Sequence, residues 1–385
     1  MKCYIKRELT PQLLRDTPPR AVCVYGPRRI GKSTLLENLV RKEPHRWFNG
    51  DMPSAAEELN FHAEGDVLNA LLQAKTIVID EAHKIPNIGS VVKMLVDANE
   101  KLETPRKILI TSSSAFYLAA VKESALGRVV SRRMWPFSLS ELANNSSWGH
   151  LVETIEHRIV YGMMPTVVEA PERARSYLTD YCEGYLLRDF FEENVIRYPG
   201  KLKQLLKRLA HYVGSVISYD NLAREIGLNR ITIEDYIDRL EKASLIRVCH
   251  SFSRNLANEM KKGKKIYFFD TGVRNAILND FSPLSAREDA GALWENFFYM
   301  ERVKLHDARE DFKEIYFWRT TGNAPREIDF IEVVDNKIEA FECKVSKAAK
   351  AKISKTFQRA YPNTTVTKAT PQDIFAIFAN TRSNF

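Results

Sequence analysis

The sequence lacks the features of a membrane-spanning or secreted protein. No stretch approaches the ~18 uninterrupted apolar residues that a membrane helix needs. The N-terminal segment lacks the apolar region and the small-residue cleavage site of a signal peptide. We therefore expect a cytoplasmic protein that has no membrane partner.

Cysteine is scarce and scattered along the chain. Five cysteines occur, none of them in CxxC spacing or clustered with histidine, which argues against a zinc site of the common spacings. Cys23 and Cys343 lie in apolar, strand-like runs, where a thiol serves as a small buried side chain. A disulfide framework is not expected, in agreement with a reducing compartment.

Internal repeats and low-complexity tracts are also absent. The 385 residues are 44% hydrophobic and 28% charged, which is ordinary for a globular protein. At ~150 residues per domain, the length predicts two to three domains. The net charge of +8 favours an acidic partner such as nucleic acid.

Two basic runs stand out, and the first contains no acidic residue. Their members are Lys344, Lys347, Lys350, Lys352, Lys355, Arg359 and Lys368, and then Arg254, Lys261, Lys262, Lys264 and Lys265. Each run can be either a solvated face or a surface that holds phosphates.

Residues 20–145 alternate apolar strands with helices. Continuous apolar runs predict strands at residues 20–25, 76–80 and 107–112, and helical patterns predict helices at 32–42 and 85–99. Fully apolar strands separated by helices are typical of a parallel sheet covered on both faces. The predicted fold class is therefore α/β.

A phosphate-binding loop joins the first predicted strand to the first helix. It matches the GxxxxGK[ST] pattern, with the residues Gly26, Pro27, Arg28, Arg29, Ile30, Gly31, Lys32, Ser33 and Thr34. The glycines let backbone N–H groups point at a β-phosphate, and the helix N-terminus adds positive potential. Lys32 is expected to reach the β- and γ-phosphates, and Ser33 to ligate Mg²⁺. ATP and Mg²⁺ are the predicted cofactors.

Polar residues end the other two predicted strands. Asp80 is expected to hold Mg²⁺ and Glu81 to polarise the attacking water, with a pair of exposed strand-end acids as the alternative. Ser112, in a run of serines that reaches Ser114, is expected to sense the γ-phosphate or else to form a turn. His83 completes a DEAH tetrapeptide that occurs in one helicase class, but other helicase motifs are not apparent, so His83 is interpreted as incidental.

Arginines follow the last predicted strand. Arg128 precedes Arg132 and Arg133 and is the first candidate for an arginine finger that reaches the γ-phosphate of a neighbouring subunit. A surface charge is the alternative. A finger of this kind implies a homo-oligomer.

The middle of the chain is predominantly helical. Residues 211–252 fit a winged helix-turn-helix, with one helix capped by Ser218 and a second at residues 232–243. The second helix of such a module enters the DNA major groove. Its exposed face would carry three acidic residues, which phosphates repel. A linker module that packs against the ATPase is the alternative.

Strand patterns return near the C-terminus, at residues 265–269, 314–318, 328–334 and 337–342, with Asp335 and Asn336 as a hairpin turn. Asp329 lies in the third of these strands. Glu342 and Lys344 belong to the fourth and point to one face, because side chains alternate along a strand.

These charged residues form a candidate catalytic set together with Glu295, which lies on an apolar helix. Asp329 and Glu342 are expected to hold Mg²⁺, and Lys344 to stabilise charge at an attacked phosphate. The set resembles the PD-(D/E)XK nuclease superfamily. Ordinary strand-edge charges around a packing domain are the alternative.

The chain also resembles an AAA+-type family of prokaryotic ATPases that carries a C-terminal domain distantly related to restriction endonucleases. The motifs that carry this resemblance are residues 26–34, 79–86, 110–114 and 126–128, and a tyrosine-rich helix from Tyr177 to Asp189. Two departures occur, at Thr111-Ser112, where Thr-Gly is usual, and at residues 162–165, where a more glycine-rich turn is usual.

Four segments are expected in this α/β protein. They are an AAA+-like ATPase core (1–145), a helical lid (146–200), a winged helix-turn-helix (201–262) and a restriction-endonuclease-like domain (263–385). The expected function is Mg²⁺-dependent ATP hydrolysis coupled to action on nucleic acid, DNA rather than RNA, including metal-dependent cleavage. The alternative is a nucleotide-switched regulatory protein with an inactive nuclease-like domain.

Overall fold

A computed structural model describes residues 4–16, 18–113, 125–186, 196–252, 263–311, 313–320, 325–334, 337–350 and 354–379. The chain divides into two compact units. Lys6–Trp135 form most of the first unit, and Pro136–Glu241 with Leu245–Phe385 form most of the second. Among the described residues, no helix is long and apolar enough to cross a membrane.

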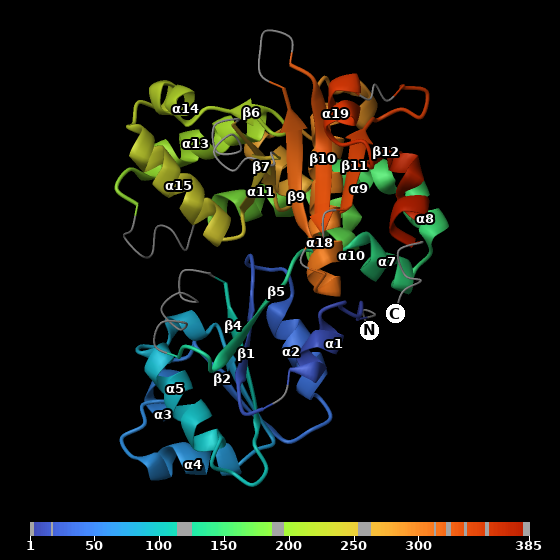
Figure 1. Cartoon of the computed structure of the whole chain (residues 1–385). Coiled ribbons are helices and arrows are strands. Elements are labelled where there is room, and N and C mark those ends of the chain that lie inside the picture. The colour runs from blue at the N-terminus through green and yellow to red at the C-terminus, as the bar shows by residue number, and fades with distance from the viewer. Residues whose placement is uncertain are drawn as a thin grey trace. The chain divides into compact units, whose positions relative to one another are not determined.

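The first unit contains a five-stranded sheet in the order β2-β3-β4-β1-β5, in which all neighbouring strands are parallel (Figure 1). The strands are β1 (Ala21–Tyr25), β2 (His45–Asn49), β3 (Thr76–Asp80), β4 (Lys107–Ser112) and β5 (Val129–Arg133). The predicted strands β1, β3 and β4 are confirmed, as is the parallel α/β class. The two edge strands, β2 and β5, had not been anticipated, because both are partly exposed and carry polar side chains.

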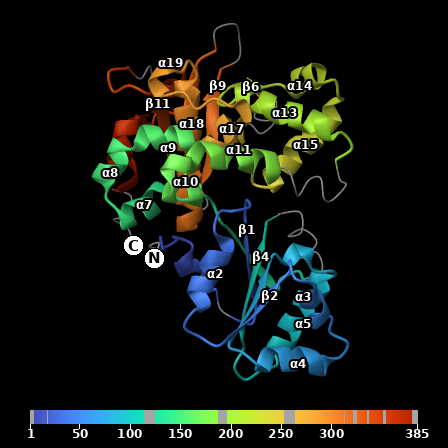
Figure 2. The same cartoon turned by 180° about the vertical axis from the view of Figure 1, so that it is seen from behind.

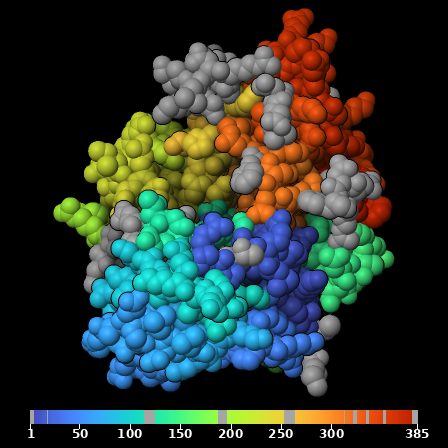
Figure 3. Space-filling model, turned by 60° about the horizontal axis from the view of Figure 1, so that its bottom comes forward, coloured from blue at the N-terminus to red at the C-terminus, as the bar shows by residue number. Residues whose placement is uncertain are grey.

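Helices cover this sheet. They are α1 (Thr10–Arg15), α2 (Lys32–Val40), α3 (Pro53–Glu58), α4 (Glu64–Leu72), the short 3₁₀ helix η1 (Ala82–Lys84) and α5 (Ile88–Asn99). Ile77, Val78 and Ile79 of β3 are fully buried, so both faces of the central strands are covered as predicted. In the space-filling view of Figure 3, the blue and cyan atoms of this unit form a continuous surface on the face shown.

The second unit contains a seven-stranded mixed sheet in the order β12-β11-β10-β9-β7-β8-β6. The strands are β6 (Val216–Ile217), β7 (Ile246–Ser251), β8 (Lys264–Phe268), β9 (Glu314–Arg319), β10 (Glu327–Val334), β11 (Lys337–Cys343) and β12 (Thr365–Ala369). β11 pairs with β12, and β7 with β9, in parallel, whereas the other neighbours are antiparallel. The boundary expected between residues 262 and 263 therefore falls inside one sheet. Asp335 and Asn336 lie outside the described residues.

Helices surround this second sheet. The α-helices are α7 (Leu139–Asn145), α8 (Trp148–Glu153), α9 (Ile155–Tyr161), α10 (Pro165–Glu169), α11 (Ala174–Gly184), α13 (Pro199–His211), α14 (Tyr219–Ile226), α15 (Arg230–Lys242), α17 (Thr271–Leu278), α18 (Ala290–Arg309) and α19 (Lys355–Ala360). Short turns of helix are η2 (Pro171–Arg173), η3 (Leu284–Ala286), η4 (Pro371–Asp373) and the π-helix η5 (Phe375–Ala379). Figure 2 shows α9, α11 and α17 side by side, and α17 contacts both of the others. The described part of the expected lid, residues 146–200, therefore belongs to the second unit.

Two helices separated by a tight turn occupy the position expected for a helix-turn-helix. The Ser218 hydroxyl accepts a hydrogen bond from the Asn221 N–H and caps α14. Gly227 ends this helix in the left-handed conformation, and Asn229 caps the next helix through the Thr232 N–H. The predicted helices are confirmed, although α15 begins at Arg230, two residues earlier than predicted.

A buried ion pair joins α18 to the sheet. The Arg302 guanidinium donates to both carboxylate oxygens of Glu332 at 2.6 Å, and neither side chain is more than 5% exposed. His306 approaches the same carboxylate at 3.1 Å. Although burial raises it, the pKa of Glu332 is held down at about 2 by Arg302.

Glu332→Ala is expected to lower the free energy of unfolding by ~3–5 kcal/mol, because it leaves a buried guanidinium without its counter-charge. The matched control is Glu339→Ala. Glu339 lies opposite on β11, is 54% exposed and pairs with Lys313 at 3.4 Å. Exposed pairs contribute only ~0–1 kcal/mol. Urea unfolding measures both variants, and equal losses would contradict the prediction.

Candidate functional site

The phosphate-binding loop follows β1 and leads into α2. Gly26 has a φ of 153°, and a Cβ there would lie 2.2 Å from the carbonyl oxygen of Met134, so only glycine fits. Gly31, at a φ of 91°, turns the chain into the first turn of α2. Between the glycines, Pro27 and Ile30 are buried, Arg28 is half-buried and Arg29 is exposed.

Lys32 is buried, and its ammonium donates to the carbonyl oxygens of Gly26 and Pro27, each at 3.0 Å. The lysine therefore extends along the loop that would enclose a phosphate. Thr34 is exposed on the first turn of α2. The N-terminus of this helix places its first backbone N–H groups and its positive dipole end beside the same loop.

A serine and an aspartate meet where magnesium is expected. The Ser33 hydroxyl donates to the Asp80 carboxylate at 3.0 Å, and the Thr111 hydroxyl donates to the same oxygen, Oδ1. β4 lies between β1 and β3, so parallel pairing gathers their carboxyl ends at one edge of the sheet. A hydroxyl and a carboxylate are ligands that Mg²⁺ accepts, and these residues fit a Mg²⁺–nucleotide site.

Glu81 is held by Thr111 and His83, to which the sequence analysis assigned no role in the site. It has a left-handed backbone, and its N–H donates to the Thr111 hydroxyl at 2.9 Å. Its carboxylate lies 3.3 Å from Nδ1 of His83, whose Nε2 lies 3.3 Å from the Ser113 hydroxyl. His83, interpreted as incidental, thus connects Glu81 to the end of β4. Ser112 is buried at that end, and Ser114 lies outside the described residues.

Arg128 and Arg133 lie at opposite ends of the sheet. Arg128 precedes β5 beside the amino end of β1, where its carbonyl accepts from the Ala21 N–H and its guanidinium pairs with Asp97. Arg133 lies opposite Tyr25, at the end that carries the phosphate loop. Its Nε donates to the Tyr25 hydroxyl at 3.1 Å. The structure does not bring Arg128 to the phosphate loop of its own chain.

Asp329 and Glu342 are neighbours across two antiparallel strands. Phe330 of β10 pairs with Phe341 of β11, so the next residue on each strand, Asp329 and Glu342, shares one face of the sheet. The register of β10 shifts between Ile328 and Ile331, which places Asp329 in an irregularity of the kind that re-aims a side chain. The Cys343 N–H donates to Oδ2 of Asp329 at 2.7 Å.

Lys344 lies beside both carboxylates. Its ammonium is 3.0 Å from Glu342 Oε2 and 3.8 Å from Asp329 Oδ2. Burial, together with the charge of Asp329, raises the pKa of Glu342 to about 7. Burial also raises the pKa of Asp329. Although burial would lower it, the two carboxylates raise the pKa of Lys344 above its ordinary value.

Glu295 belongs to the same group of acids through a second lysine. Its carboxylate accepts from the Lys265 ammonium at 2.9 Å and from the Tyr267 hydroxyl at 2.6 Å, and Lys265 also pairs with Glu327. Burial raises the pKa of Glu295 to about 7. Glu295, Glu327, Asp329 and Glu342 are named the C-terminal carboxylate cluster below.

The sequence places Lys265 in a basic run at the protein surface, and this interpretation is wrong. Its side chain is only 1% exposed, because Lys265 and Tyr267 alternate with apolar residues on β8 and point inward to α18. Lys264 remains partly exposed, and Arg254, Lys261 and Lys262 lie outside the described residues. Polar residues that alternate with apolar ones on a strand are typical of a solvent-facing side, so the local sequence carried no signal that Lys265 is buried.

The fit of a divalent cation to this cluster rests on one unpaired atom. Glu342 Oε1 is buried and has no hydrogen-bond partner among the described residues. The described ranges contain no group of three His, Cys, Asp or Glu side chains positioned to hold a metal. Two carboxylates suffice for Mg²⁺ when substrate phosphates and water complete its shell, so Asp329 and Glu342 fit such a site.

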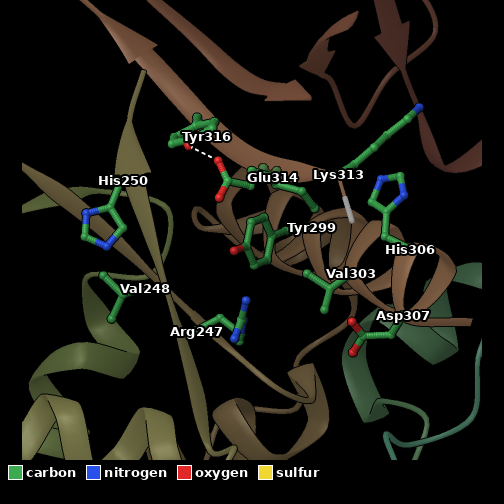
Figure 4. Close-up of a pocket in the computed structure, with 11 residues that line it drawn as sticks. Arg247, Val248, His250, Tyr299, Val303, His306, Asp307, Lys313, Glu314 and Tyr316 are labelled. Atoms are coloured by element: carbon green, nitrogen blue, oxygen red, sulfur yellow. Dashed lines mark hydrogen bonds between the residues drawn. The ribbon is translucent and has the colours of Figure 1, made fainter. Parts of the chain in front are cut away.

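A separate cavity of about 260 Å³ opens where β7 and β9 diverge (Figure 4). In Figure 4 its lining residues come from these two strands, from α18 and from Lys313 just before β9, with Tyr299 central and Glu314 bonded to Tyr316. The lining also includes Arg247, Asp307 and Lys313, so both charges occur. It shares no residue with the C-terminal carboxylate cluster.

Comparison with known protein families agrees with the fold observed for the first unit. The family described as AAA domain matches residues 18–143, which contain the phosphate loop, Asp80 and all five parallel strands. The first unit has the fold of a P-loop ATPase. Two families described as domains of unknown function, DUF8612 and DUF4143, match residues 152–284 and 290–377.

Individual relatives are distant. The uncharacterized protein Rv2008c of Mycobacterium tuberculosis is 26% identical over 347 residues, covering 88% of this chain and 74% of that protein. The solved Walker-type ATPase PABY2304 of Pyrococcus abyssi has a TM-score of 0.48 and 13% identity, covering 71% of this chain and 96% of its own. The ORC1 protein of Aeropyrum pernix, solved in complex with DNA, has a TM-score of 0.31 and 13% identity, covering 71% and 89%.

Proposed function

We propose that the first unit binds and hydrolyses ATP with Mg²⁺. The contact between Ser33 and Asp80 at 3.0 Å carries this proposal, because it joins the loop that holds phosphate to the strand that ends in acids. In the hydrolysis step Lys32 neutralises charge on the β- and γ-phosphates, and Glu81 accepts a proton from the attacking water. Ser112, at the end of β4, senses the γ-phosphate.

Glu81→Gln is expected to leave ATP binding intact and to slow turnover by about 10²–10⁴-fold, the range typical of losing a general base. The amide can still meet His83 but cannot accept the proton. Phosphate release under saturating ATP measures turnover, and a fluorescent nucleotide measures binding. Hydrolysis at the unsubstituted rate would remove Glu81 from this role.

Arg128 acts, in this proposal, on the nucleotide of a neighbouring copy, because it lies at the opposite end of its own sheet from the phosphate loop. Lys32→Ala chains retain Arg128, and Arg128→Ala chains retain the phosphate loop. Mixing the two is expected to restore activity that neither has alone, and the rate per chain is expected to rise with concentration. Arg133→Ala is the comparison, since Arg133 lies at the phosphate end. No restoration, with a rate independent of concentration, would favour a monomeric switch.

We further propose that the C-terminal carboxylate cluster acts on nucleic acid, with DNA as the first substrate to test. Asp329 and Glu342 would hold a divalent cation, which supplies Lewis-acid stabilisation of a phosphodiester under attack. Lys344 then stabilises the negative charge that develops on the phosphate. Several members of the basic run, among them Lys347, Lys350 and Lys355, lie within 11 residues of Lys344 and would hold the backbone.

The helix-turn-helix is proposed to support this unit rather than to read DNA bases. Arg230 pairs with Asp220 and Glu234, and Arg239 pairs with Asp235, so the arginines of α15 are engaged by acids. Its exposed face therefore offers little net positive charge to phosphates.

A nucleotide-switched regulatory protein is the second candidate function. The pairing of Lys265 with Glu295 and Glu327 favours it, because this half of the cluster is already neutralised. Cleavage of plasmid and single-stranded DNA, measured with Mg²⁺ or Mn²⁺ and with or without ATP, separates the two functions. Binding without cleavage under every condition would support the switch.

A further inference from the structure

The C-terminal carboxylate cluster divides into two halves, each with its own lysine. Asp329 and Glu342 face Lys344, whereas Glu295 and Glu327 face Lys265. The two lysines differ in exposure: the Lys344 side chain is 29% exposed and can move, but that of Lys265 is 1% exposed. The second half is therefore closed by a fixed internal cation.

Packing holds Lys265 in place. It lies on β8 between β6 and β7, opposite Val216 and Cys249, and its ammonium is 5.4 Å from the centre of the Phe317 ring. A buried ammonium is costly unless it is paired, so the two carboxylates and the aromatic face stabilise this position together. If the ammonium left, the carboxylates of Glu295 and Glu327, whose side chains are 13% and 30% exposed, would face each other without a counter-charge.

This placement limits what else the cluster can hold. Two-metal phosphodiester sites place their cations ≈ 3.5–4 Å apart, each between carboxylates. A cation held by Glu295 and Glu327 would have to occupy the position of the Lys265 ammonium, which lies 2.9 Å from Glu295 Oε1. In the other half, the buried Oε1 of Glu342 has no hydrogen-bond partner among the described residues and can serve as a ligand atom.

We propose that the Lys265 ammonium takes the place of a second divalent cation, so that the cluster binds one metal ion, on Asp329 and Glu342. Glu295 is then a positioning residue that holds Lys265 and does not ligate the metal. Lys265 would supply, at a fixed position, positive charge that a second cation supplies in two-metal sites. This inference rests on the proposed metal site at Asp329.

The test is the number of Mn²⁺ ions bound by the full-length chain without nucleotide, measured by electron paramagnetic resonance. All variants carry Asp80→Asn, which removes the carboxylate ligand at the phosphate loop. The reference protein is expected to bind one Mn²⁺, and Asp329→Ala to bind none. Lys265→Met is expected to bind two, whereas Lys264→Met, the adjacent and partly exposed lysine, is expected to bind one.

If Lys265→Met does not fold, as judged by circular dichroism, Glu295→Gln tests whether Glu295 ligates the metal ion. The glutamine oxygen still accepts hydrogen bonds from Lys265 and Tyr267, so Mn²⁺ affinity is expected to change by less than about threefold. Two Mn²⁺ in the reference protein, or a loss of at least about tenfold in Glu295→Gln, would overturn the inference and leave the proposed function standing. Mn²⁺ binding that survives Asp329→Ala would overturn the proposed metal site, and with it the inference.

Discussion

Lys32→Ala is expected to reduce ATP hydrolysis to the background rate and to weaken ATP binding. Lys32 is buried in the phosphate loop, and its ammonium already lies along the carbonyl oxygens of Gly26 and Pro27. Alanine removes the charge that would meet the β- and γ-phosphates, and the loop keeps only its backbone N–H groups. Phosphate release and nucleotide titration measure the two effects.

The matched control is Lys42→Ala, an exposed lysine just beyond the end of α2. It changes the net charge equally but leaves the loop intact, so turnover is expected to stay within about twofold of the reference, as for an exposed substitution. Equal losses in both variants would point to general destabilisation. Retained hydrolysis in Lys32→Ala would remove the loop from the proposed reaction.

The position of the phosphate-binding loop beside Asp80 was largely predictable because its information is local. The loop pattern lies in one continuous segment between a buried strand and a helix, and Asp80 ends the next apolar strand. The role of Thr111 was not predictable in the same way. It depends on β4 lying between β1 and β3, a parallel order that no short segment encodes. The contact of His83 with Glu81 depends on the short helix η1 that returns the histidine toward the strand end.

In the C-terminal half, the sequence predicted one part of the carboxylate cluster and missed the other. The proximity of Asp329 on β10 to Glu342 on β11 was predictable, since a hairpin brings nearby residues together, whereas Glu327 had not been named. Lys265 was not, because its partners Glu295 and Glu327 are 30 and 62 residues away in sequence. A lysine that follows other lysines in the sequence is typical of a solvent-exposed segment. Only the inward direction of alternate residues on β8 shows that this one is internal.

Asp329→Ala is expected to eliminate metal-dependent cleavage of DNA and to leave ATP hydrolysis unchanged. Its carboxylate and that of Glu342 share one face, and the substitution leaves one carboxylate where Mg²⁺ needs two. The phosphate loop and Asp329 belong to different compact units, so the ATPase reaction retains every group that it uses. Nicking of supercoiled plasmid and phosphate release, measured on the same preparation, report the two activities.

The control for Asp329→Ala is Glu314→Ala, which removes an exposed carboxylate on β9 and is expected to cleave normally.

DNA binding supplies a second measure. Because lysines near Lys344 would neutralise phosphates, the logarithm of the affinity for DNA is expected to fall linearly with the logarithm of the salt concentration. Asp329→Ala removes a negative charge beside these lysines, so the variant is expected to bind DNA at least as tightly as the reference protein while it fails to cut. A variant that loses binding and cleavage together would show that Asp329 maintains the fold of the unit. A variant that still cuts would assign the phosphodiester chemistry elsewhere.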